Sequence, residues 1–252
     1  ADTITFGTAN VKVADGTLTV NSVGGLIDFE GSILGTSDEV LVLNADGSGT
    51  DAASANEKVI VAAIGSGNQI HSVSITGRDG ITLEGNITTS NKASNNVSFT
   101  GPVSINAATV AIDTDATGND GTVTFSSTID STTGTSRNLD IVSATGNVTV
   151  TGAIGATTAL ASLDINQAGG DGDITLTSNI GADASNPGVT GVTRIGNAAT
   201  ADLNLNGTVY TTGGATTYAS AGTDLGGSSP TFTTSADTIT FGTGNVTIAD
   251  GT

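Results

Sequence analysis

Apolar and polar residues alternate along most of the chain, and no stretch sustains the three-to-four-residue apolar spacing of an amphipathic helix. Successive side chains of a β-strand point to opposite faces, so this alternation predicts short strands with one apolar face. Segments rich in Gly, Asn and Asp separate the alternating stretches, and these residue types favour turns. The pattern therefore predicts an all-β protein.

A seven-residue pattern recurs, in which an apolar-polar-apolar triplet is followed, four positions later, by a further Ile or Val. It occurs at residues 27–33, 81–87, 97–103, 123–129, 148–154, 174–180 and 203–209. From Val97 to Leu203 its copies follow one another at steps of roughly 25 residues, whereas the step from Ile81 to Val97 is clearly shorter. We interpret this spacing as a repeated unit that holds a short first strand, a turn and this second strand.

A unit of this size, with two or three strands, cannot bury its own apolar face, but stacking neighbouring units would bury it continuously. The pattern predicts a parallel β-helix, or β-solenoid, of roughly ten coils, with Val, Ile and Leu inside and with Gly and Asn at the corners. Tandem antiparallel β-sandwich domains are the alternative, because closely spaced short strands suit both folds. The recurrence of one strand pattern in phase favours the β-helix, since strands within a sandwich need not resemble each other.

Three stretches depart from the rhythm. Residues 44–57 and 182–191 are predicted to be excursions from a coil, and residues 211–230 are either a surface loop or a loosely patterned coil. Tyr218 is the one aromatic residue that the pattern places in a loop.

The chain contains one stretch twice. Residues 1–17 (ADTITFGTANVKVADGT) and residues 236–252 (ADTITFGTGNVTIADGT) differ at three positions only. Self-similarity at a fixed offset is typical of repeat proteins. We expect residues 1–235 to be one module and residues 236–252 to be the start of the next, with neighbouring copies of the module as partners.

Charge and composition exclude several classes of function. The net charge is −18, and the six Lys and Arg residues are dispersed, so the chain lacks the clustered cations that a nucleic-acid-binding surface needs. Cys is absent, which excludes disulfides and thiol chemistry. There is no apolar run of about 18 residues, so we expect no membrane insertion.

Residues suited to catalysis are few. The single histidine, His71, is expected to lie on the outer surface, and no nucleophile motif accompanies it. Two carboxylates at a suitable separation can hydrolyse a glycosidic bond, and the alternation puts Asp28 with Glu30, and Asp113 with Asp115, on the same face of a strand. The chain is poor in the aromatic residues that usually support a bound sugar, so we expect no enzyme.

Calcium is the one cofactor with a candidate site. Asp113, Asp115 and Thr117 offer oxygen atoms at alternate positions before Gly118, as calcium-binding loops do. Thr124 stands where such a loop would place its bidentate Glu, so the pattern is incomplete. Asp113 and Asp115 are thus a speculative calcium site, and solvated acidic turns are the alternative interpretation.

Residues 154–165 (IGATTALASLDI) and 146–152 (GNVTVTG) resemble the Gly- and Thr-rich strand repeats of large repetitive bacterial surface proteins, the filamentous-haemagglutinin-like and autotransporter-like β-helix adhesins. The resemblance covers most of the chain and is one of style rather than of a specific signature. It implies secretion, a right-handed β-helical shaft and a role in adhesion or in extracellular fibres.

These observations together predict a non-enzymatic structural repeat of an extracellular, cell-surface adhesin or fibre that stacks end to end into a rod. A module that binds a glycan or a host surface is the alternative, and a β-helix enzyme acting on polysaccharides is a further one. A binding module should concentrate aromatic residues or Arg in its loops, and these loops hold mainly Gly, Ser, Thr, Asn and Asp.

Overall fold

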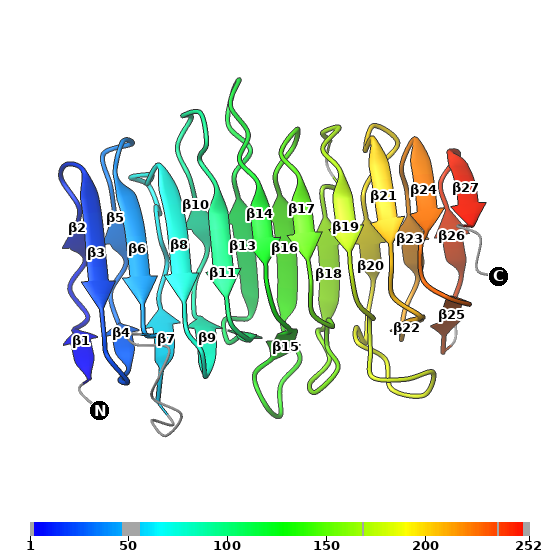
Figure 1. Cartoon of the computed structure of the whole chain (residues 1–252), viewed down its shortest axis with the longest axis horizontal. Coiled ribbons are helices and arrows are strands. Elements are labelled where there is room, and N and C mark those ends of the chain that lie inside the picture. The colour runs from blue at the N-terminus through cyan, green and yellow to red at the C-terminus, as the bar shows by residue number, and fades with distance from the viewer. Residues whose placement is uncertain (1–2, 47–55, 168, 236, 249–252) are drawn as a thin grey trace.

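The computed structural model of the chain describes residues 3–46, 56–167, 169–235 and 237–248, and within them every regular element is a β-strand. Nearly all strands pair in parallel with the equivalent strand one turn further along the chain. The molecule is an elongated β-solenoid of about ten turns whose two termini lie at opposite ends (Figure 1). The prediction of a parallel β-helix is confirmed, and the sandwich alternative is wrong.

Three faces run along the solenoid, and we call them faces A, B and C in the order in which the chain visits them. Face C is one ten-stranded sheet. Its strands are β3 (Thr17–Asn21), β6 (Val40–Asn44), β8 (Ser72–Thr76), β11 (Val97–Thr100), β14 (Val123–Phe125), β17 (Val148–Val150), β19 (Ile174–Leu176), β21 (Asp202–Leu205), β24 (Gly222–Leu225) and β27 (Asn245–Ile248).

Face A begins as a six-stranded sheet and continues through single bridges at Ile154 and Ile180 into a final strand pair. Its strands are β1 (Ile4–Phe6), β4 (Ile27–Phe29), β7 (Lys58–Val61), β9 (Gly80–Leu83), β12 (Val103–Ile105), β15 (Ile129–Ser131), β22 (Val209–Thr212) and β25 (Thr231–Thr234). The two bridging isoleucines therefore stand where two turns have no full strand on this face.

Face B begins as a strand pair and continues through a bridge at Ile64 into a seven-stranded sheet. Its strands are β2 (Val11–Lys12), β5 (Ile33–Leu34), β10 (Ile87–Thr88), β13 (Thr109–Asp113), β16 (Asn138–Val142), β18 (Ser162–Ile165), β20 (Thr193–Ile195), β23 (Thr216–Tyr218) and β26 (Ile239–Phe241). Each face thus has ten levels when the three bridges are included.

The predicted spacing gives the register of face C. Val97 pairs with Val123, Val123 with Val148, Val148 with Ile174, and Ile174 with Leu203. Each step between successive copies of the pattern is therefore one turn of the solenoid. Matching registers place like residues above one another, so the alternation of every strand buries the same side.

Of the two or three strands expected per unit, the structure shows three strand positions in each turn. Ile27 and Ile81 begin the paired segments of face A, whereas Val97 and its successors begin strands of face C. The step from Ile81 to Val97 is short because it leads from one face to another rather than through a full turn. The seven-residue pattern describes a strand and the corner after it, and it occurs at more than one corner.

Apolar ladders fill the interior. Ile, Leu and Val side chains at the inward positions of successive turns are almost fully buried, as are Phe29, Phe99 and Phe125. The rings of Phe99 and Phe125 stack with their centroids 4.7 Å apart, and Phe29 stacks on Phe6 in the same manner. Stacked rings add to the stabilisation that burial of apolar area supplies.

Tyr218 shows that the stretch around it is part of the solenoid and not a loop. It lies in β23 with 1% of its surface exposed, so its placement in a loop is wrong. Residues 211–230 belong to regular turns of the solenoid rather than to a surface loop, because in β23 Thr216 and Tyr218 point inward and Thr217 points outward. Tyr218 packs against Tyr210, Phe232 and Phe241. Burial raises the pKa of its phenol well above the ordinary value, and the nearby Tyr210 raises it further.

Corners use residues that tolerate positive φ, as expected. Gly155 has a φ of +66°, and a Cβ there would collide with the carbonyl oxygen of Gly188 in the next turn. Asn166 adopts a φ of +49° at another corner, and its side chain bonds to buried Ser143. The predicted excursion at 182–191 includes a turn in which Asp183 accepts backbone N–H bonds, whereas most of the one at 44–57 lies outside the described residues.

Candidate functional site

A row of hydroxyl side chains runs along the outside of face C. Ser74, Ser98, Thr124, Thr149 and Thr175 are in register on five consecutive strands. The spacing between neighbours is the strand spacing of about 4.8 Å. The row continues through Asn204 and Asp224 toward the C-terminal end. It is a regular surface of hydrogen-bonding groups that includes the Asp224 carboxylate.

Two carboxylates lie next to each other on the outside of face B. Asp140 is in register with Asp164, and Asp164 is in register with Arg194, whose Nη1 lies 3.2 Å from the Asp164 Oδ1. Burial raises the pKa of Asp140, and the charges of Asp164 and Asp113 raise it further. The sheet thus holds these two carboxylates next to each other despite their repulsion, which the Arg194 guanidinium partly offsets.

The two residues of the speculative calcium site lie at the end of β13. The backbone N–H of Asp115 donates to the Asp113 Oδ1 at 3.0 Å. The pKa of Asp113 is raised, mainly by burial and further by the Asp115 charge, although the bond from the Asp115 amide acts in the opposite direction. Among the described residues no group of three or more Asp, Glu or His side chains is placed to hold a metal ion. The calcium site stays a prediction.

Of the two carboxylate pairs that suggested glycoside chemistry, Asp28 and Glu30 lie in and directly after β4 on face A. Burial raises the pKa of Asp28, and the charges of Glu30 and Glu84 raise it further. Sequence reasoning missed Glu84, although Glu30 and Glu84 occupy the same position of the seven-residue pattern. The ring of Phe29, on the same strand as Asp28, is buried and stacks on the ring of Phe6. The His71 ring interacts with the backbone, since its Nε2 lies 2.9 Å from the Ala93 carbonyl oxygen.

Glu39 is a buried carboxylate that sequence reasoning did not identify. It is 1% exposed, and its Oε2 accepts the backbone N–H groups of Thr36 at 2.6 Å, Ser37 at 3.0 Å and Asp38 at 3.2 Å. The Thr36 hydroxyl donates to the other oxygen. Burial raises the pKa of Glu39, but these bonds outweigh it and lower the pKa to about 2. The Thr-x-x-Glu spacing was the available signal, because it occurs where a side chain caps backbone N–H groups.

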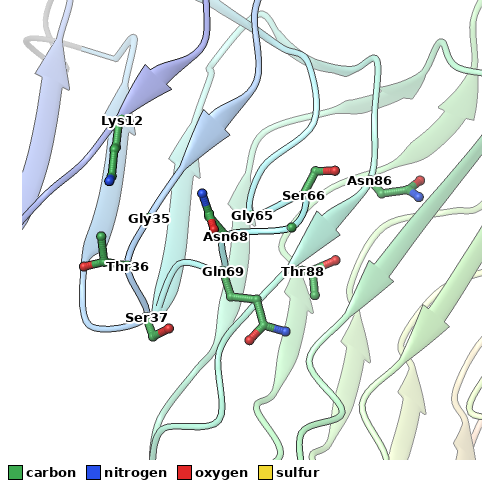
Figure 2. Close-up of a pocket in the computed structure, with 11 residues that line it drawn as sticks. Lys12, Gly35, Thr36, Ser37, Gly65, Ser66, Asn68, Gln69, Asn86 and Thr88 are labelled. Atoms are coloured by element: carbon green, nitrogen blue, oxygen red, sulfur yellow. The ribbon is translucent and has the colours of Figure 1, made fainter.

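A polar pocket of about 510 Å³ lies on face B beside the Glu39 turn. Figure 2 shows Asn68 and Gln69 between the turn that carries Thr36 and Ser37 and the strand that carries Thr88. The pocket forms where the third turn has no full strand on face B and pairs through single bridges at Ile64 and Ile70, with bends between them. Its lining holds hydroxyl, amide and backbone groups with one cation, Lys12, and no aromatic ring.

A second carboxylate lies in the interior with a cation. The Arg78 Nε is 2.6 Å from the Glu57 Oε2, and Glu57 is 1% exposed. The Glu57 N–H also donates to the Asp79 side chain one turn further on, at 3.0 Å. These contacts tie two neighbouring turns together at a corner, which is a structural role.

Comparison with protein-family models, with curated proteins and with solved structures found no match. Within the described residues, no helix is long and apolar enough to cross a membrane.

Proposed function

We propose that the chain is a structural module of an extracellular, cell-surface adhesin or fibre, in which successive modules stack end to end into a long rod. The module acts as a shaft and catalyses no reaction. The observation that carries this proposal is the strand pairing along all three faces, which extends through about ten turns without a globular interruption in the described chain.

The ends of the solenoid support the same conclusion. Strands β1, β2 and β3 at one end, and β25, β26 and β27 at the other, each pair with a single neighbour in the described structure. Such strands present free backbone N–H and C=O groups that favour pairing with another strand. The repeated stretch supplies a partner of the right sequence, since residues 236–252 repeat residues 1–17.

The acidic surface suits an exposed shaft. With a net charge of −18, neighbouring rods repel one another, and Asp140 and Asp164 place part of that charge on the outside of face B. The same charge disfavours anionic nucleic acids and anionic membrane surfaces as partners. The likeness in style to filamentous-haemagglutinin-like adhesins is a further ground for an extracellular location.

Electron microscopy of chains with one, two and four modules tests this proposal. Each added module should lengthen a straight rod by about 45 Å, because nine turns rise by about 4.8 Å each. A length that does not increase with module number would overturn the proposal. Protease treatment of intact cells that produce the full protein tests the location, since a surface shaft is cleaved and an internal protein is not.

Glycan binding is the second candidate, and the polar pocket is the observation that favours it. Thr36, Asn68, Gln69 and Thr88 line it and carry hydroxyl and amide groups, the groups that hydrogen-bond to hydroxyl-rich ligands. A glycan array tests this function, with Gln69→Ala as the pocket variant and Thr149→Ala as a surface control. Binding that Gln69→Ala abolishes would establish the pocket as a glycan site, whereas an array without binding would exclude it.

A further inference from the structure

The repeated stretch occupies different faces at the two ends of the solenoid. In the first copy, Ile4–Phe6 is β1 on face A, and Ile4 pairs with Ile27. In the second copy, the identical triplet Ile239–Phe241 is β26 on face B, and Ile239 pairs with Thr216. One sequence thus forms the same short strand on two faces.

The next strand of each copy shows the same displacement. Val11–Lys12 is β2 on face B, whereas Asn245–Ile248, which contains the equivalent residues, is β27 on face C. Both copies travel in the same direction around the solenoid, but the second is one face ahead. The interval between the two copies therefore corresponds to nine turns and one face rather than to a whole number of turns.

A second motif is displaced in the same way within the chain. Ile64 bridges two strands of face B and leads through Gly65, with a φ of +75°, to β8 on face C. Ile154 bridges two levels of face A and leads through Gly155, with a φ of +66°, to β18 on face B. The corners of the solenoid are thus similar enough for one sequence to serve at successive corners, and a shift by one face needs no new backbone geometry.

An apolar cavity of about 410 Å³ lies at the C-terminal end of the solenoid. Leu225, Phe232, Phe241, Val246 and Ile248 contribute to its lining. Ile248 is 69% exposed and Val246 is 44% exposed, which is unusual for large apolar side chains of a strand.

The first copy shows what covers these positions. Val13, the equivalent of Ile248, is only 7% exposed, because it is followed by β3 and by a further turn that includes β5. In β3, Leu18 and Val20 point inward, and Val20 is 7% exposed. The segment that covers this sequence in the first turn is therefore Thr17–Asn21 together with the turn that follows it.

We infer that the C-terminal end of one module receives the Thr17–Asn21 strand of the following copy on face A, beside β25, so that every module is turned by one face relative to its predecessor. Leu18 and Val20 of the following copy then fill the apolar cavity next to Phe232. This inference rests on the proposed end-to-end stacking and specifies its geometry. Face A of each copy continues face B of the copy before it.

The surface of the rod changes accordingly. The hydroxyl row of face C and the carboxylate pair of face B each pass to an adjacent side at every junction, and they return to the starting side after three modules. A shaft built in this way presents both features on all sides along its length, and the acidic pairs of successive modules lie on different sides.

Paired nitroxide labels in a two-module chain test the geometry, because the protein has no native Cys. One variant carries Thr233→Cys in the first copy and Thr19→Cys in the second. The matched variant carries Asp224→Cys in the first copy, on face C, with the same second label. The three labelled positions point outward, so the variants should keep their fold, which far-UV circular dichroism checks.

A shift by one face predicts a strongly broadened spectrum for the pair at 233 and 19, since adjacent strands lie about 4.8 Å apart, and a weaker interaction for the pair at 224 and 19 on different faces. Broadening of the 224 and 19 pair alone would overturn the shift while leaving end-to-end stacking intact. Absence of broadening in both pairs would show that the two modules do not stack at all, which contradicts the proposed function as well.

Discussion

Phe125 provides a direct test of how the solenoid is stabilised. Its side chain lies in β14 with 0% of its surface exposed, and its ring stacks on that of Phe99 one turn earlier, with 4.7 Å between the centroids. Thr124, the preceding residue, belongs to the outward hydroxyl row. Substitutions at Phe125 and Thr124 therefore measure separately how much the inward apolar ladder and the outward hydroxyl row contribute to the free energy of unfolding.

Phe125→Ala should lower the free energy of unfolding by about 3–5 kcal/mol, the usual cost of removing a buried phenyl ring and leaving a cavity. About 0.5–1.5 kcal/mol of this should be the stacking with Phe99, which a double-mutant cycle with Phe99→Ala measures. Thr124→Ala should change the free energy of unfolding by no more than about 0.5 kcal/mol, because the side chain contacts mainly solvent and its row neighbours.

Urea unfolding followed by far-UV circular dichroism measures these differences, and amide hydrogen exchange locates them. Each turn contacts only its neighbours, so Phe125→Ala should reduce protection most in β11, β14 and β17. Equal destabilisation by Thr124→Ala and Phe125→Ala would contradict an apolar interior as the source of stability, because the two faces of the strand would then not differ in burial.

Three further substitutions test other parts of the structure. Glu39→Gln should lower the free energy of unfolding by about 2 kcal/mol at pH 7, because it weakens the bonds from the backbone amides. The pKa of Glu39 in the folded state is lowered to about 2, so this stability is present above about pH 4.5 and is lost as the pH falls toward 2. Urea titrations should therefore show a smaller difference between the variant and the original protein at pH 3 than at pH 7. Asp140→Asn should stabilise the fold by about 0.5 kcal/mol at pH 7, because burial and like charges raise the pKa of this carboxyl and penalise its charged form. The gain should vanish below about pH 4, where the carboxyl is protonated in both the folded and the unfolded state. A loss of stability at pH 7 would contradict the repulsion. Gly155→Ala should cost about 2–4 kcal/mol because of its positive φ and the backbone of Gly188, whereas Gly7→Ala, with open space around it, should leave the melting temperature unchanged.

The turn-to-turn register could be predicted from the sequence because it depends on local alternation and on spacing. Nearly equal steps between Val97, Val123, Val148 and Ile174 are single turns, and each triplet must bury its first and third residues. The core phenylalanines followed from the same rule, since they occupy the third position of a triplet.

The assignment of strands to faces could not be predicted in this way. The seven-residue pattern is the same at residues 27–33 and 123–129, yet the first begins on face A and the second on face C. A strand and its corner carry the same signal wherever they lie around the axis, and only the count of turns distinguishes them. Tyr218 was misplaced because Gly-rich flanks hid a triplet of Thr216, Thr217 and Tyr218 that alternates like the others.

The candidate site was less accessible to sequence reasoning than the fold. Asp140 and Asp164 belong to different turns and are in register on neighbouring strands, so their repulsion appears only once the turns are stacked. The polar pocket depends on a missing strand on face B, and the junction cavity depends on which face the repeated stretch occupies. Each of these features is a property of the stacking rather than of a segment.

Cryo-electron microscopy of rods formed by a multi-module chain distinguishes a β-solenoid shaft from an array of separate domains. A β-solenoid shaft gives a straight rod with strands perpendicular to its axis and an axial repeat of about 4.8 Å from one turn to the next. Compact particles, or a string of globular beads without that axial repeat, would contradict the β-solenoid shaft.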